Sequence, residues 1–97
     1  MVLCGGIGAL KEVDDECREV LAHVRAECEG KAGRQFSHFE PVHFKTQLVN
    51  GINFFIKAKV GESDFIHVRA HKAFAGEITL WGIQEGKALE EEVEYFQ

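Results

Sequence analysis

The stretch TQLVNGIN, residues 46–53, joins two apolar-rich segments and decides how the rest of the chain can be arranged. Asn50-Gly51 between two such segments is the strongest short-range signal for a tight β-hairpin, and it predicts a type I′ turn. Leu48 and Val49 stand directly beside this turn, where a solvated tip is normally polar. They are either the ends of buried strands or an apolar pair that is presented to a partner.

Segments with a period of about two lie on both sides of this turn. Pro41 in the segment before the turn indicates an edge position or a bulge. Further turns are predicted at GESD (61–64) and FAGE (74–77). The whole pattern predicts an antiparallel meander of four or five strands. The strand segments read FEPVHFKTQLV, INFFIKAKV, FIHVRAHKA and ITLWGI.

A helical period precedes the strands. From about residue 12 to residue 30, apolar residues recur at helical spacing, and charged residues fill the other face. Gly30 and Gly33 are the stop signals, and the glycines within residues 1–9 predict a flexible arm. One long helix followed by a strand meander is an α+β fold, and 97 residues suit a single domain, 1–97. The apolar helix positions are Val13, Cys17, Val20, Leu21, Val24 and Cys28.

Charge and cysteine content exclude several kinds of partner. The net charge is -5 with no block of Lys or Arg, which argues against nucleic acid and against a membrane surface. The cysteines are Cys4, Cys17 and Cys28, and the latter two would lie roughly 16 Å apart on one helix. An internal disulfide is therefore not expected, and we expect a reduced, cytoplasmic protein. Cys4, in the glycine-rich arm, is the candidate for an intermolecular disulfide.

Patterns for catalysis or metal binding are weak. His67 and His71 share a strand face by parity but would be roughly 13 Å apart, and no His/Cys pair has zinc-finger spacing. A nucleophilic cysteine needs a base beside it, whereas two cysteines face the helix core and Cys4 lies in the arm. Glu90–Glu92 is interpreted as a solvated face. We expect no enzyme activity, no metal and no cofactor, so the function is expected to reside in a binding surface.

Strand counting suggests where that surface lies. In an antiparallel meander the turns at 50–51 and 74–76 are separated by two strands, so they fall at the same end of the sheet. The polar GESD turn falls at the opposite end. Leu48 and Val49 at one tip and Phe74 at the other would form an apolar end that core packing does not require. Exposed apolar patches of this kind mark interaction sites.

The sequence QLVNG (47–51) resembles the Q-x-V-x-G loop of the cystatins, and its surroundings resemble the stefins, cytosolic single-domain cystatins without disulfides. The similarity covers nearly the whole chain, through CGG near the start, VRAECEGKAGRQF, FKTQLVNGINFFIKAKVG, DFIHVRAHKA and the terminal YF. It implies a helix wrapped by a four- or five-stranded sheet. It also implies reversible, competitive inhibition of papain-like cysteine proteases such as the cathepsins.

In this family a three-part wedge blocks the active-site cleft, and the resemblance implies the same parts here. They would be the arm, the first hairpin and the second hairpin. Gly5 would let the arm turn away from the catalytic cysteine of the protease, so that the inhibitor is not cleaved. The protease-binding residues implied are Leu3, Cys4, Gly5, Gln47, Leu48, Val49, Asn50, Gly51, Phe74 and Ala75.

The chain departs from the family pattern in both loops. Leu48 and Asn50 replace residues that are common in the first loop, but Leu keeps the apolar bulk and Asn before Gly suits a left-handed turn position. The second loop, KAFAGEIT, is shorter than in typical stefins and has Phe74 where they carry Leu-Pro. The alternative to a monomeric inhibitor is a non-inhibitory module of the same fold. It would self-associate by domain swapping, with the hairpin at 50–51 as its hinge.

Overall fold

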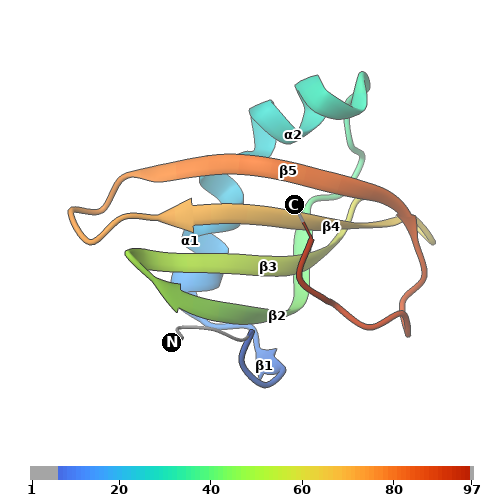
Figure 1. Ribbon diagram of the computed structural model, residues 1–97. Coiled ribbons are helices and arrows are strands. Elements are labelled where there is room, and N and C mark those ends of the chain that lie inside the picture. Colours follow the sequence, from blue (N-terminus) through green and yellow to red (C-terminus); the bar gives the residue numbers. More distant parts are fainter. Residues whose placement is uncertain (1–6, 97) are drawn as a thin grey trace.

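Five antiparallel strands form one sheet in chain order, and two helical segments cover one of its faces (Figure 1). The computed structural model describes residues 7–96. This arrangement confirms the α+β fold and the meander that the sequence predicts. The elements are β1 (Lys11–Glu12), α1 (Asp15–His23), α2 (Arg25–Ala32), β2 (Glu40–Val49), β3 (Gly51–Lys59), β4 (Phe65–Lys72) and β5 (Ile78–Lys87).

The single long helix of the sequence prediction is two segments that meet at Val24. The helix begins later than predicted, because Lys11–Glu12 pair with β2 as a short strand. Asp14 then caps α1, its carboxylate accepting the N–H of Cys17 at 2.8 Å. At the junction the Val24 N–H donates to the carbonyl of Leu21 at 3.2 Å, a tighter turn than the α-helix makes.

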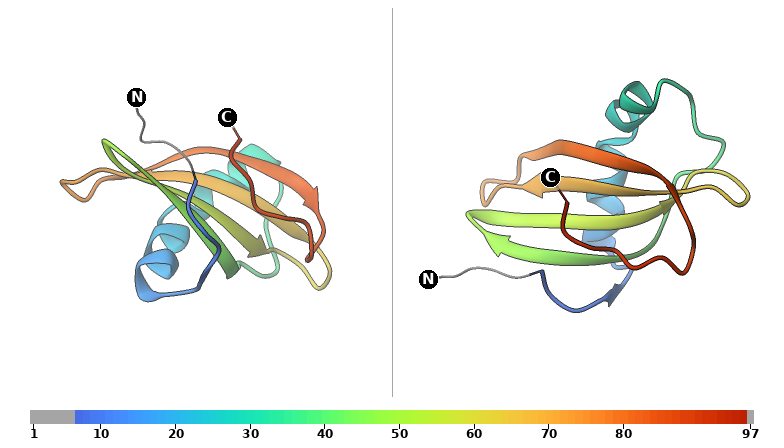
Figure 2. Two further views of the ribbon diagram at one scale, coloured as in Figure 1. Left: turned by 60° about the horizontal axis from the view of Figure 1, so that its bottom comes forward. Right: turned by 45° about the vertical axis from the view of Figure 1, so that its right-hand side comes forward.

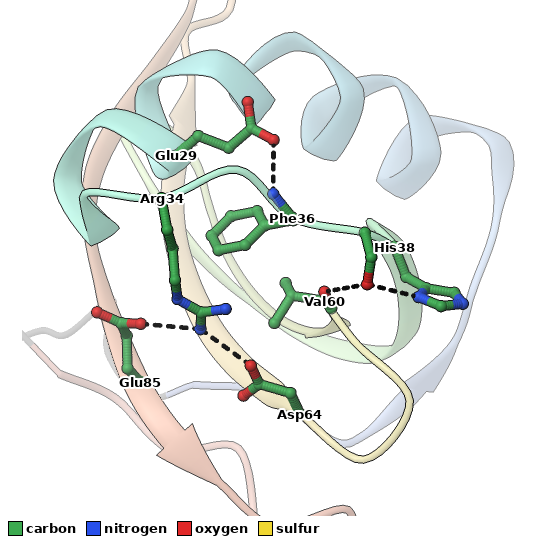
Figure 3. Close-up of polar contacts among 8 residues, drawn as sticks. Glu29, Arg34, Phe36, His38, Val60, Asp64 and Glu85 are labelled. Atoms are coloured by element: carbon green, nitrogen blue, oxygen red, sulfur yellow. Dashed lines mark hydrogen bonds and ion pairs between the residues drawn. The ribbon is translucent and has the colours of Figure 1, made fainter.

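The end of α2 is fixed to the strands beneath it. Gly33 ends the helix at a φ of 74°, as its stop signal predicts, whereas Gly30 lies inside the helix. The guanidinium of Arg34 then bridges two carboxylates, Asp64 at 3.0 Å and Glu85 at 3.1 Å (Figure 3). These contacts join the helix end to the β3–β4 turn and to β5.

Apolar residues between the helices and the sheet form the core. Alternate residues of β3 and β4 face the helices, as the period of two predicts. Burial raises the pKa of both core thiols, Cys17 and Cys28, to about 12, and both are free. The buried cluster comprises Cys17, Val20, Leu21, Val24, Cys28, Phe36, Phe44, Phe54, Ile56, Ala58, Val60, Ile66, Val68, Ala70 and Leu80.

The other face of the sheet is covered by the segment that follows β5, residues 88–96, which we call the C-terminal segment (Figure 2). The ammonium of Lys57, which is fully buried, donates to three of its backbone carbonyls: Ala88, Leu89 at 2.8 Å and Glu91 at 2.7 Å. Val93 is also fully buried. The side chains of the acidic stretch 90–92 are exposed, which confirms their interpretation as a solvated face, while the backbone of the same stretch is held against the sheet.

The side chain of His67 lies on this covered face, beside Lys57, its register partner. Its side chain is 1% exposed, and its Nε2 has no hydrogen-bond partner in the part of the chain that is described. Burial, together with the nearby charge of Lys57, lowers the pKa of His67 to about 4. His67 is therefore neutral in the folded protein at neutral pH and at mildly acidic pH.

We predict that His67 makes the folded state less stable as the pH falls from about 6.5 to 4. In this window the unfolded chain binds a proton that the folded chain does not, so the free energy of unfolding decreases by at most about 3 kcal/mol. Urea unfolding of the His67→Gln variant should show a shallower dependence on pH than the parent. His23→Gln, at an exposed helix position, is the control and should keep the parent dependence. Equal dependences in parent and His67→Gln would contradict the prediction.

Candidate functional site

Two apolar hairpin tips project from the same end of the sheet. The pairing of Ile52 with Lys72 places the β2–β3 turn beside the β4–β5 turn, and the β3–β4 turn lies at the far end (Figures 1 and 2). Leu48 is 66% exposed at the first tip and Phe74 is 74% exposed at the second. Val49 is half-buried. The exposure of Leu48 rules out, for this residue, the interpretation that it is the end of a buried strand.

Both tips turn at a glycine with positive φ. Gly51 has a φ of 107° and Gly76 a φ of 108°, whereas no other kind of residue has a positive φ between residues 7 and 96. Asn50 therefore does not take the left-handed conformation that a type I′ turn requires, and that prediction was wrong. The register pairs Leu48 with Ile52 and Val49 with Gly51, so Asn50 alone stands between the two strands and the glycine closes the turn. Each glycine stands two residues after an apolar residue, Val49 or Phe74.

Gly51 is pressed against the end of β4. A β-carbon at this position would lie 2.7 Å from the carbonyl oxygen of Lys72 and 2.8 Å from the ring of His71. Gly76 has nothing within 4 Å of the same point. Glycine is thus required at position 51 for its backbone conformation and for space, but at position 76 for conformation alone.

A row of polar side chains crosses three strands behind the first tip. The Nδ2 of Asn53 donates to the Oε1 of Gln47 at 3.0 Å, and the Oδ1 of Asn53 lies 2.9 Å from the Nδ1 of His71. Gln47 and Asn53 are register partners, as are Asn53 and His71. We call these three residues the polar ladder. Asn53 is only 5% exposed, so its amide depends on these partners.

Sequence reasoning assigned Gln47 to the site but missed Asn53 and His71. The missing signal is the strand register. Once β2, β3 and β4 are paired around the turn at 50–51, the period of two puts all three side chains on one face.

The N-terminal segment runs beside the first hairpin. Gly8 donates its N–H to the carbonyl of Thr46 at 2.7 Å, two residues before Leu48. The part of the expected arm that is described is thus hydrogen-bonded to β2. Leu3, Cys4 and Gly5, which the family resemblance implies as protease-binding residues, lie outside the described residues.

An ion pair ties the second hairpin to the helix. The ammonium of Lys72 lies 3.1 Å from a carboxylate oxygen of Glu16 and 3.5 Å from one of Glu19. The hydrogen bond to Glu16 raises the pKa of Lys72. The strand that leads into the second tip is thereby joined to α1. Ala75 and Phe74 beyond it are exposed.

Within residues 7–96 no three His, Cys, Asp or Glu side chains are grouped so as to hold a metal ion. In the same part of the chain, no helix is both long enough and apolar enough to cross a membrane.

Comparison with known proteins places this arrangement in a family. The cystatin domain model matches residues 5–94. Cystatin-A2 of Dictyostelium discoideum is 35% identical over 96 residues, which is 99% of this chain and the full length of that protein. Human cystatin-B is 36% identical over 98 residues, 98% of this chain and the full length of that protein. Cystatin-B of Oplegnathus fasciatus is 35% identical over 98% of each chain. The chain belongs to the cystatin family, as the resemblance of QLVNG indicated.

We predict that Gly51→Ala destabilises the fold more than Gly76→Ala does. Both substitutions place a side chain at positive φ, which disfavours the folded state by about 1–2 kcal/mol. Only the alanine at position 51 also collides with backbone and with the His71 ring. Thermal unfolding of the two variants beside the parent separates the two contributions. Equal losses would show that the first tip moves away from β4 without penalty.

Proposed function

We propose that the chain is a reversible, tight-binding competitive inhibitor of papain-like cysteine proteases, the cathepsins among them. The observation that carries the proposal is the exposure of Leu48 and Phe74 on two adjacent hairpin tips. Membership of the cystatin family supports it. The partner is a protease whose active-site cleft receives both tips, and no cofactor is needed. The free core thiols fit a reducing, cytoplasmic setting.

The shape of the tips suits them to a cleft. A glycine closes each turn, and the first turn is packed against β4, so little conformational freedom is left to lose on binding. Leu48 and Phe74 gain by leaving water, because burial of a large apolar side chain is worth about 1.5–3 kcal/mol. Val49, Asn50 and Ala75 would fill the space around them, and the backbone of Gly51 would let the tip enter a narrow slot.

The tips alone do not account for tight binding. Leu48, Val49 and Phe74 together contribute roughly 5–9 kcal/mol when fully buried. A nanomolar complex needs about 12 kcal/mol beyond the entropy lost on association. We therefore assign much of the remainder to the arm, with Leu3 and Cys4 along the cleft and Gly5 at the point where the arm turns away from the catalytic cysteine.

Substitution of Leu48 by Asp should raise the inhibition constant for papain at least about a hundredfold, because it buries an unpaired charge in a desolvated cleft. The parent should titrate papain to a stoichiometric end point. Leu89→Asp is the matched control, since Leu89 is an exposed leucine of the C-terminal segment, away from both tips. It should titrate as the parent does. Equal weakening by the two variants would count against a cleft-binding tip.

The same titration tests self-association. If the pure monomer leaves papain active and gel filtration shows a stable dimer, the apolar tips serve contacts between copies of this chain. The chain would then be the non-inhibitory module that is the alternative function.

Deletion of residues 1–5 should weaken inhibition strongly for proteases with an open cleft, by about a hundredfold or more if the arm supplies even 3 kcal/mol. The inhibition constants of truncated and parent chains for papain give the comparison. Far-UV circular dichroism and thermal unfolding should agree for the two chains, because Gly8 and β1 remain. An unchanged inhibition constant would remove the arm from the wedge.

A further inference from the structure

The polar ladder connects the two tips, and its role in inhibition rests on the proposed function. Its members come from three adjacent strands: Gln47 from β2, Asn53 from β3 and His71 from β4. Two residues after His71, Ala73 begins the second turn, accepting the N–H of Gly76 at 2.9 Å and donating to the carbonyl of Glu77 at 2.8 Å. The ladder thus runs from the first hairpin to the base of the second.

The hydrogen-bond directions along the ladder follow from the amide of Asn53. Its Nδ2 donates to Gln47, so its Oδ1 faces the His71 ring. An amide oxygen only accepts, hence the Nδ1 of His71 carries a hydrogen. That hydrogen is present in the neutral Nδ1–H tautomer and in the imidazolium ion alike, so the bond to Asn53 does not depend on which of the two forms is present.

The same ring supports the first turn directly. The atoms of His71 that approach Gly51 are Cε1 and Nε2, the edge of the ring opposite the bond to Asn53. His71 is thereby held at Nδ1 by β3 while its other edge packs under the tip. A change in the ring position would shift the turn on which Val49 and Asn50 stand.

We propose that His71 is a positioning residue of the inhibitor. Through Asn53 and Gln47 it holds the first tip in a fixed relation to the second, so that Leu48 and Phe74 enter the cleft as one rigid body. The amide of Gln47, implied by the resemblance as a protease contact, is bound inside the inhibitor by Asn53. Loss of the ladder lets the first tip move and shortens the lifetime of the complex.

Two substitutions of His71 test this role. His71→Phe keeps a ring under Gly51 but removes the donor to the Oδ1 of Asn53, so that this oxygen loses its bond to His71 while the Nδ2 keeps its bond to Gln47. His71→Asn carries an amide nitrogen the same number of bonds from the backbone as Nδ1. The first should speed dissociation from papain about three- to tenfold, the size expected for one lost hydrogen bond, and the second should restore the parent rate in part. In the free chain, the backbone amides of residues 48–52 should exchange hydrogen faster in His71→Phe than in the parent, and His71→Asn should not show this increase.

Double variants show whether the effect passes through the ladder. In an Asn53→Leu background, His71→Phe should add nothing to the dissociation rate, because the partner is already gone. Additive effects would overturn the proposal, as would equal dissociation rates and exchange in the parent and His71→Phe. Nitrogen-15 spectra of the ring should show the neutral Nδ1–H tautomer, and a neutral Nε2–H tautomer would also overturn it. Exchange and ring spectra need no protease, so they decide the ladder even if the parent fails to inhibit papain.

Discussion

The close approach of Gly51 to the end of β4 is the contact on which the end of the sheet that carries both hairpin tips depends. With no side chain at this position, the first turn lies against the carbonyl of Lys72 and the ring of His71. The two strand pairs then keep their register up to the last residues, with Ile52 opposite Lys72. Two separate turns consequently protrude from the same end of the sheet, each with an exposed apolar side chain.

The rest of the molecule gives this end a firm base by covering both faces of a small sheet. On one face the helices bury an apolar cluster. On the other, the C-terminal segment surrounds the ammonium of Lys57 with backbone carbonyls, and Arg69 lies over the rings of Phe55, Trp81 and Tyr95 at 4.6–5.5 Å. A buried cation is tolerated when its donors are satisfied. Three carbonyls satisfy the ammonium of Lys57 in this way, whereas the Nε of Arg69 has no partner within the described residues. The two cations attach the segment to the sheet beside the buried side chains of Phe55 and Val93.

Local patterns were enough to predict the order of elements. The change from a helical period to a period of two located the helix and the strands, and Asn50-Gly51 located the first hairpin. Pro41 indicated the irregularity that the structure shows between residues 41 and 43. The prediction of a type I′ turn was wrong because the turn type depends on how Leu48 pairs with Ile52. The dipeptide Asn50-Gly51 does not determine that pairing. The division of the helix at Val24 was not predicted, because the apolar helical period runs through this residue without interruption.

The candidate site was predictable in part for the same reason. Counting strands placed Leu48 and Phe74 at one end, since strand direction follows from sequence alone. The ladder was missed because its members are far apart in sequence and meet only through register. The covering of Lys57 was missed because its ammonium is held by backbone carbonyls of residues 88, 89 and 91, which a pattern of side chains does not reveal.

Polar bonds hold the end of the sheet that lies beyond the described contacts of the C-terminal segment. Its last described contact with the sheet is the carbonyl of Phe96, which accepts from Arg69 at 2.9 Å. His71 lies two residues further along the same face, beyond this cover. Hydrogen bonds among Gln47, Asn53 and His71 stiffen the end of the sheet without adding bulk, so the same end can be both rigid and open to a partner.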